Sequence, residues 1–146
     1  MQLTRSADRG VRVMTHVATL GPGGRVNALE LADATGTPVA FLGKILQRLV
    51  AARLIVSHRG CDGGFELARP ARDISLLDVV TALEGRLCLN ACLPGGAGCD
   101  RSPWCAVHLV WAEAQAALAR VLASASIENL ARASVGRRAA LDGSHA

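Results

Sequence analysis

The sequence has no uninterrupted apolar run that approaches the length needed to span a membrane. Its first dozen residues carry four charged side chains, which fit neither a spanning helix nor a secretory signal: Arg5, Asp8, Arg9 and Arg12. A phosphate-binding loop, a motif that joins a nucleophile to its base, and a suggestive pair of carboxylates are also missing. We therefore expect a cytoplasmic protein without a membrane partner and without enzymatic activity.

The composition is that of a globular chain. Apolar residues make up 51% of the 146 residues, which excludes a mostly disordered protein and allows one domain with a real core, or a small domain with an assembly element. Residues 1–72 hold ten Lys and Arg against five Asp and Glu, whereas residues 73–146 hold six against seven. The basic half indicates a polyanionic partner, most commonly nucleic acid, although a merely solvated basic face explains the same charge.

The cysteines are clustered, with four of the five inside residues 88–108. In a reducing cytoplasm such a cluster favours metal ligands or redox sensors over disulfides, and an odd number of cysteines cannot all pair within one chain. Cys92, Cys99 and Cys105 are separated by six and then five residues. The proline and glycines between the first two allow the backbone to fold back, so the three sulfurs can converge on an inorganic centre.

A helix is expected to begin directly before the last of these cysteines. Ser102 can serve as its N-cap and Pro103 as its first residue. This places Cys105 in the first turn, where the helix dipole and the unpaired amides favour a thiolate. His108, three residues further on, shares the same face of that helix.

Residues 3–20 predict an amphipathic helix with a basic edge. The edge is formed by Arg5, Arg9, Arg12 and His16. Asp8 interrupts it, and the plainest interpretation is an i,i+4 pair with Arg12, worth about 0.3–0.5 kcal/mol if exposed.

Two further helices are predicted around a tight turn. Asn27 and Glu30 form a capping box that opens the first helix, and Gly36 ends it. Thr37 caps the second helix, which is expected over residues 38–52. Two helices joined by about three residues predict a helix-turn-helix.

The second of these helices is expected to have a buried side and an outer side. The buried side holds Val39, Leu42, Leu46 and Leu49, flanked by Phe41 and Ile45. The outer side holds Ala40, Lys44, Gln47 and Arg48. Its small residues allow close approach to a major groove, so the predicted DNA contacts are Thr37, Lys44, Gln47 and Arg48. An ordinary surface helix explains the pattern of this helix equally well.

A hairpin after the two helices shifts that balance toward DNA binding. Residues 54–58 and 65–68 predict strands, and residues 59–64 predict a tight turn. Arg59 at the tip is expected to lie against a phosphate or to enter a minor groove. The predicted fold class is therefore mainly α with a small β-hairpin wing, a winged helix-turn-helix, followed by a capped helix over residues 75–83.

Residues 106–125 predict a long helix with a heptad seam, formed by Val107, Trp111, Ala114, Leu118, Val121 and Ala125. The seam favours a homodimer, and an intramolecular core helix is the alternative. A short helix is expected to follow, as far as about Ala133. The predicted organisation is a DNA-binding domain at residues 1–85, a cluster-binding loop at 86–105, dimerisation helices at 106–134 and a disordered tail at 135–146.

The order of elements and several local strings resemble the Rrf family of bacterial winged-helix regulators. These strings are MQLTRSADRGVRVM, FLGKILQRL, SHRGCDGGFELARP, ISLLDVVTALEG and the three-cysteine loop. The resemblance covers residues 1–133. It implies a homodimeric transcription regulator, a repressor, that binds palindromic double-stranded DNA. It also implies an iron-sulfur cluster whose state sets operator affinity in response to nitric oxide, redox state, or iron and cluster supply.

The resemblance also implies the ligands of a 2Fe-2S or 4Fe-4S cluster, namely Cys92, Cys99 and Cys105. In some members of the family a histidine three positions after the last cysteine completes the site, and His108 matches that place. In others an aspartate early in the first helix of the other protomer does so, and Asp8 matches it. The first gap of six residues is one longer than is common in close relatives, so cluster type stays open.

Other chemistries can use the same side chains. Three thiolates with a harder fourth ligand suit an iron-sulfur cluster, because the weaker ligand leaves one iron labile. A Cys3His zinc site and a metal-free thiol switch are the alternatives. Cys88 is a third candidate for the fourth ligand, but its place before the loop favours a buried structural thiol. A metal-binding adaptor that does not act on DNA is the alternative function.

Overall fold

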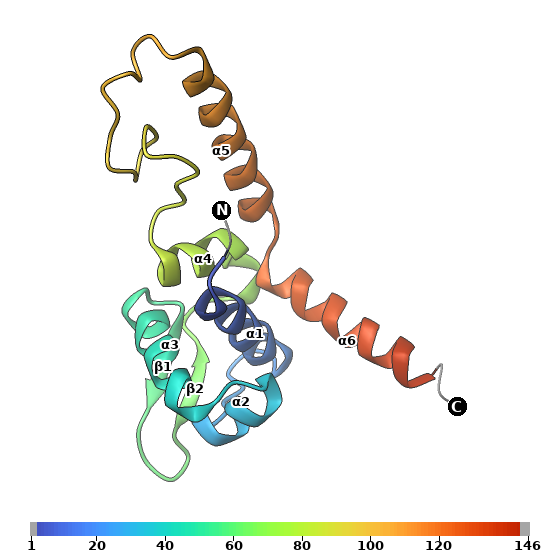
Figure 1. Ribbon diagram of the computed structural model, residues 1–146. Coiled ribbons are helices and arrows are strands. Elements are labelled where there is room, and N and C mark those ends of the chain that lie inside the picture. Colours follow the sequence, from blue (N-terminus) through green and yellow to red (C-terminus); the bar gives the residue numbers. More distant parts are fainter. Residues whose placement is uncertain (1–2, 144–146) are drawn as a thin grey trace.

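The computed structural model describes residues 3–143, and side chains as far as residue 141. A small globular unit holds the first four helices and a hairpin, and two further helices extend from it (Figure 1). In chain order the elements are α1 (Arg5–Thr19), α2 (Ala28–Thr35), α3 (Val39–Ala51), β1 (Ile55–His58), β2 (Gly64–Leu67), the 3-10 helix η1 (Ala71–Asp73), α4 (Leu76–Glu84), α5 (Ala106–Ser124) and α6 (Ile127–Gly143). This confirms the predicted fold class.

Local capping sets where the first helices begin and end. The Asn27 side chain accepts from the N–H groups of Leu29 and Glu30, and the Glu30 carboxylate accepts from the N–H of Asn27, which is the predicted capping box. Gly36 ends α2 in the left-handed conformation, with φ 60°. Ser75 and Asp78 form a second reciprocal box at the start of α4, again as predicted.

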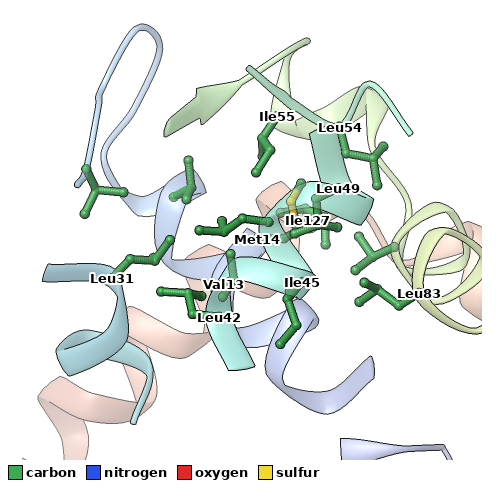
Figure 2. Packing of buried hydrophobic residues seen from close by; sticks show 14 of the residues in the cluster. Val13, Met14, Leu31, Leu42, Ile45, Leu49, Leu54, Ile55, Leu83 and Ile127 are labelled. Atoms are coloured by element: carbon green, nitrogen blue, oxygen red, sulfur yellow. The ribbon is translucent and has the colours of Figure 1, made fainter. Parts of the chain in front are cut away.

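The core lies between α1 and the elements that surround it. The inward side of α1 is fully covered, with Ala7, Gly10, Val13, Met14 and Val17 all buried at helical spacing. Residues of α2, α3, α4, the hairpin and the start of α6 pack on it, and Figure 2 shows Met14 in the middle of this cluster. Burial of each large apolar side chain there contributes about 1.5–3 kcal/mol to the free energy of folding. The helix-turn-helix and the wing are therefore held on one rigid body.

The wing is a short antiparallel hairpin in which Ile55 pairs with Leu67 and His58 with Gly64. The segment before α2 adds a third partial strand, because Val26 and Phe65 exchange backbone hydrogen bonds at 3.2 and 2.9 Å. The hairpin is thereby attached to the helix-turn-helix by backbone as well as by packing.

A backbone bridge fixes the junction of α5 and α6 to the globular unit. The N–H of Leu76 donates to the carbonyl of Ala125, and the N–H of Ile127 donates to the carbonyl of Ile74, both at 2.8 Å. Beyond this bridge α5 contacts α4 but buries none of its residues, and Figure 1 shows it running away from the core. Its large exposed apolar residues are Val107, Leu109, Val110, Trp111 and Val121. No helix within residues 3–143 has the length and apolar character to cross a membrane.

The predicted starts and ends of two helices are wrong. Residues 102–104 form hydrogen-bonded turns, because the N–H groups of Ser102 and Trp104 donate to the carbonyls of Cys99 and Arg101. As a result α5 begins at Ala106, and Cys105 is its N-cap rather than a first-turn residue. At the other end α6 continues to Gly143 instead of ending near residue 133, so most of the tail expected to be disordered is helical, and residues 144–146 lie outside the described residues.

The prediction for the buried side of α3 is wrong at two positions. Leu42, Ile45 and Leu46 are buried as expected, together with Leu49. Phe41 is 57% exposed and Val39 is 54% exposed. The first turn of α3 projects past the core, so the apolar residues there face outward, on the side that the sequence assigned to small and basic residues.

Candidate nucleic-acid interface and cysteine loop

The outer face of α3 carries three of the predicted DNA contacts. Lys44 and Gln47 are exposed and make no side-chain hydrogen bond within the described residues. Arg48 is also exposed, but its guanidinium donates to the carbonyl of Leu83 at the end of α4. Lys44 and Gln47 are therefore free to meet a ligand, whereas part of Arg48 holds α3 on α4.

Thr37 does not belong to this face. Its side chain is 2% exposed, and its hydroxyl oxygen accepts a hydrogen bond from Thr35 at 3.0 Å. The N-cap of α3 is Pro38, which has no side-chain cap, so Thr37 does not cap the helix as predicted. Its buried position fastens the turn of the helix-turn-helix and leaves no surface for a DNA contact.

The wing presents Arg59 at its tip and an ion-pair network at its base. Arg59 is exposed, as predicted. Below it the Glu66 carboxylate accepts from Arg25 Nε at 3.0 Å and contacts His58 Nε2 at 2.7 Å. The hydrogen bond from Arg25, and then that from His58, hold the pKa of Glu66 below its ordinary value of 4.5. This network connects the hairpin to the segment that leads into α2.

The three loop cysteines are not gathered in this structure. Cys92 and Cys105 are half-buried and Cys99 is exposed, and all are free thiols. Within residues 3–143 no group of three or more His, Cys, Asp or Glu side chains stands close enough to hold a metal ion. Asp8 lies on α1, where it forms the predicted exposed ion pair with Arg12 at 3.0 Å.

The loop is nevertheless organised. Leu93 is buried, and the N–H of Gly98 donates to the carbonyl of Ala91 at 2.8 Å. Gly95 and Gly98 have φ of 98° and 93°, a region that side-chain-bearing residues rarely occupy, so the predicted bend depends on them. Gln115 on α5 holds the loop from outside, an anchoring role that sequence reasoning missed, because a single polar residue on a helix gives no signal of its distant partner.

The donor set of the loop fits an iron-sulfur cluster. Its three thiols are free, and Nδ1 of His108 is a buried nitrogen that has no hydrogen-bond partner within the described residues. An orphaned buried nitrogen is costly unless something binds it, and a metal is one such partner. Cys88 differs from the other thiols, because its Sγ donates to the carbonyl of Asn90. Cys88 is half-buried rather than buried, and its structural role stays a prediction.

The outward α3, the hairpin wing and the uncovered α5 together define a winged-helix DNA-binding architecture. Comparison with known protein families gives the same class. The model of the Rrf2 family, described as iron-dependent transcriptional regulators, matches residues 3–133. The chain belongs to the Rrf2 family.

Relatives of known sequence agree with this assignment. The chain is 36% identical over 131 residues to Rv1287 of Mycobacterium tuberculosis, covering 90% of this chain and 81% of the relative. It is 33% identical over 132 residues to protein rrf2 of Nitratidesulfovibrio vulgaris, covering 90% of this chain and 88% of the relative. The transcriptional regulator IscR of Xenorhabdus nematophila is 28% identical over 132 residues, with 90% and 80% covered. These comparisons indicate a transcriptional regulator and no enzyme family.

Solved structures share the fold. IscR of T. potens superposes with a TM-score of 0.74 at 25% identity, covering 92% of this chain and 88% of that one. CymR, the global cysteine regulator of B. subtilis, superposes with a TM-score of 0.77 at 24% identity, covering 90% and 97%. The predicted membership in the Rrf family is confirmed.

Proposed function

We propose that the protein is a homodimeric repressor of transcription whose affinity for a palindromic operator is set by an iron-sulfur cluster. The observation that carries the DNA-binding part is the exposed pair Lys44 and Gln47 on α3, beside a wing that ends in Arg59, in a chain of the Rrf2 family. A helix with such residues enters a major groove, and the wing contacts the adjoining backbone.

The dimer is proposed to form through α5. This helix has 19 residues, none of them buried, and it exposes Trp111 and Val121 among several large apolar side chains. An exposed apolar strip of this kind marks a protein interface, and a second copy of the chain supplies a matching strip. A twofold dimer presents two α3 helices, which suits two half-sites about 34–36 Å apart.

Cys92, Cys99 and Cys105 would hold the cluster. The fourth ligand would be His108, whose Nδ1 is buried and without a partner in the described part of the chain, or the partner subunit's Asp8. The family's description as iron-dependent supports iron over zinc. When bound, the cluster supplies an iron whose fourth ligand is weaker than thiolate and which is therefore open to oxygen, nitric oxide or iron loss.

The chain offers a route from this loop to the DNA. Gln115 attaches the loop to α5, and the backbone bridge between Ser75 and Ser126 attaches the far end of α5 to the winged unit. A change in the shape of residues 86–105 would therefore act on α5 and on the separation of the two α3 helices. Because half-site spacing is fixed by the DNA, a small rotation of the winged units is enough to weaken docking of the dimer.

Oxygen-free purification followed by absorption spectroscopy and by iron and sulfide analysis tests the cofactor. Iron and sulfide in equal amounts and a visible chromophore are expected, and Cys99→Ser should lose both. Exposure of the coloured protein to nitric oxide, to oxygen and to an iron chelator, each followed by a gel shift on DNA upstream of its own gene, identifies the signal.

A zinc or thiol-based regulator is the second candidate. The exposed free thiol of Cys99 supports a thiol switch, and the three loop thiols with His108 make a Cys3His donor set for zinc. One zinc per chain, or a metal-free protein whose DNA binding follows thiol oxidation, would select this candidate over the cluster.

A further inference from the structure

A basic groove lies between the first turns of α1 and the outer side of α3. It encloses about 840 Å³, and four of its lining residues are cationic: Arg5, Arg9, Lys44 and Arg48. No carboxylate is among its lining residues. Ion pairs elsewhere on the described surface partly neutralise their arginines, as Asp8 does for Arg12. The groove therefore has a net positive charge, with four cations on its lining and the Glu84 carboxylate at its edge on Thr4, and this charge favours an anion.

Arg9 is fixed in this groove by an aromatic ring. Its guanidinium carbon lies 5.1 Å from the centre of the Phe41 ring, a cation–π contact. Such a contact leaves the edge of the guanidinium free, and that edge carries the N–H groups that match a phosphate. Phe41, although 57% exposed, thus has a function at the surface, which is to orient Arg9.

The start of α1 lies at the edge of the groove. Thr4 is the N-cap of this 15-residue helix, and Arg5 follows directly. The partial positive charge of this helix N-terminus is met by the Glu84 carboxylate, so the charge of the groove comes from its arginine and lysine side chains. Thr4 also donates to the Glu84 carboxylate, which fastens the first turn of α1 at the edge of the groove.

The groove and the proposed DNA-binding face share Lys44 and Gln47. A duplex docked on the outer face of α3 would therefore bring a sugar-phosphate strand along the border of the major groove to the first turns of α1. We infer that Arg5 and Arg9 bind a backbone phosphate of the operator at this border, held in register by Phe41. This rests on the proposed function, and it extends the DNA interface to an element outside the helix-turn-helix and the wing.

The salt dependence of operator binding tests the inference. Each phosphate contact contributes about 0.9 to the slope of log affinity against log salt, so Arg9→Gln, which removes one contact per protomer, should lower the slope of the dimer by about 1.8. Arg132→Gln is the matched control: it removes the same charge from an exposed site on α6, where Arg132 pairs with Glu128 at 3.2 Å. Its slope should equal that of the wild type, and Arg9→Lys should recover part of the loss.

Phosphate ethylation interference places the contact. Ethylation of one particular phosphate in each half-site should block DNA binding by the wild-type protein but not by Arg9→Gln. Ethylation at the other interfering phosphates should block both proteins equally. Equal slopes and identical footprints for Arg9→Gln and the wild type would overturn the inference while leaving the proposed function intact, provided Lys44→Ala still weakens binding. A wild-type protein that binds no specific DNA would overturn both.

Discussion

The side chain of Gln115 on α5 bridges both sides of the cysteine loop. Its carbonyl oxygen accepts from the N–H of Leu89 at 3.0 Å, and its amide donates to the carbonyl of Pro94 at 3.5 Å. Cys92 lies between these two attachment points. One polar residue of the proposed dimerisation helix thus positions the segment that carries the first predicted ligand.

Replacing Gln115 with Ala should loosen this loop. The loss of a hydrogen bond that leaves a half-buried N–H unpaired costs about 1 kcal/mol, which is roughly a fivefold increase in the open population. Trypsin cleavage after Arg101 should therefore speed up several-fold, while cleavage after Arg137, on α6, stays constant. Cleavage after Arg101 at the wild-type rate would mean that the loop is held by its own hydrogen bonds.

Lys44→Ala and Arg59→Ala should each weaken operator binding and flatten its salt dependence, because each removes a phosphate or base contact per protomer. Fluorescence anisotropy over a series of salt concentrations measures both effects. The exposed Arg137→Ala on α6 is the control for net charge. A slope unchanged in Lys44→Ala or in Arg59→Ala would remove that residue from the interface.

The Glu66 network makes stability depend on pH in the acid range. Because the pKa of Glu66 is lowered in the folded protein, first by Arg25 and then by His58, its stabilising contribution is complete above about pH 4.5 and is lost as pH falls through the folded value. Urea midpoints of the wild type and Glu66→Gln should therefore differ at neutral pH and converge below pH 4.5. Arg25→Gln removes the main cause of the lowered Glu66 pKa, so in that background the effect of Glu66→Gln on the urea midpoint should depend less on pH. A constant difference between the two midpoints would contradict the network.

Two helical glycines should respond oppositely to alanine. Gly136 on α6 has nothing near the position of an added methyl group, so Gly136→Ala should stabilise the protein by about 0.5–1 kcal/mol through helix propensity. At Gly10 the same methyl group would collide with Leu83 Cδ1, so Gly10→Ala should destabilise by about 1–3 kcal/mol because the buried Leu83 side chain must move. Urea unfolding of both variants gives the two signs. A stabilising Gly10→Ala would contradict the close packing of α1 on α4.

The elements that the sequence predicted well are set by local chemistry. The capping boxes at Asn27 and Ser75, the left-handed Gly36 and the hairpin all depend on neighbours within a few residues, and all are present. The helical periodicity of the apolar residues in α3 predicts the exposure of Lys44.

The errors arise from contacts that the helical pattern does not specify, one of them distant in the sequence and two of them close. Phe41 lies in the turn of α3 that projects past the core, where its ring contacts Arg9, more than thirty residues earlier in the sequence. Thr37 is buried in the turn, where its hydroxyl group accepts a hydrogen bond from Thr35. The start of α5 moved because Ser102 bonds to the carbonyl of Cys99 instead of capping a helix. Convergence of the three cysteines on a cluster remains a prediction, because it depends on a cofactor that is not part of the polypeptide.

The operator affinity of the oxygen-free dimer, measured before and after the iron is removed with a chelator, tests the central claim most directly. We expect Kd to change by about tenfold or more as the colour is lost, and we expect the affinity of a Cys99→Ser protein not to respond to the chelator. Equal Kd values with and without iron, in a protein that was coloured at the start, would contradict the claim.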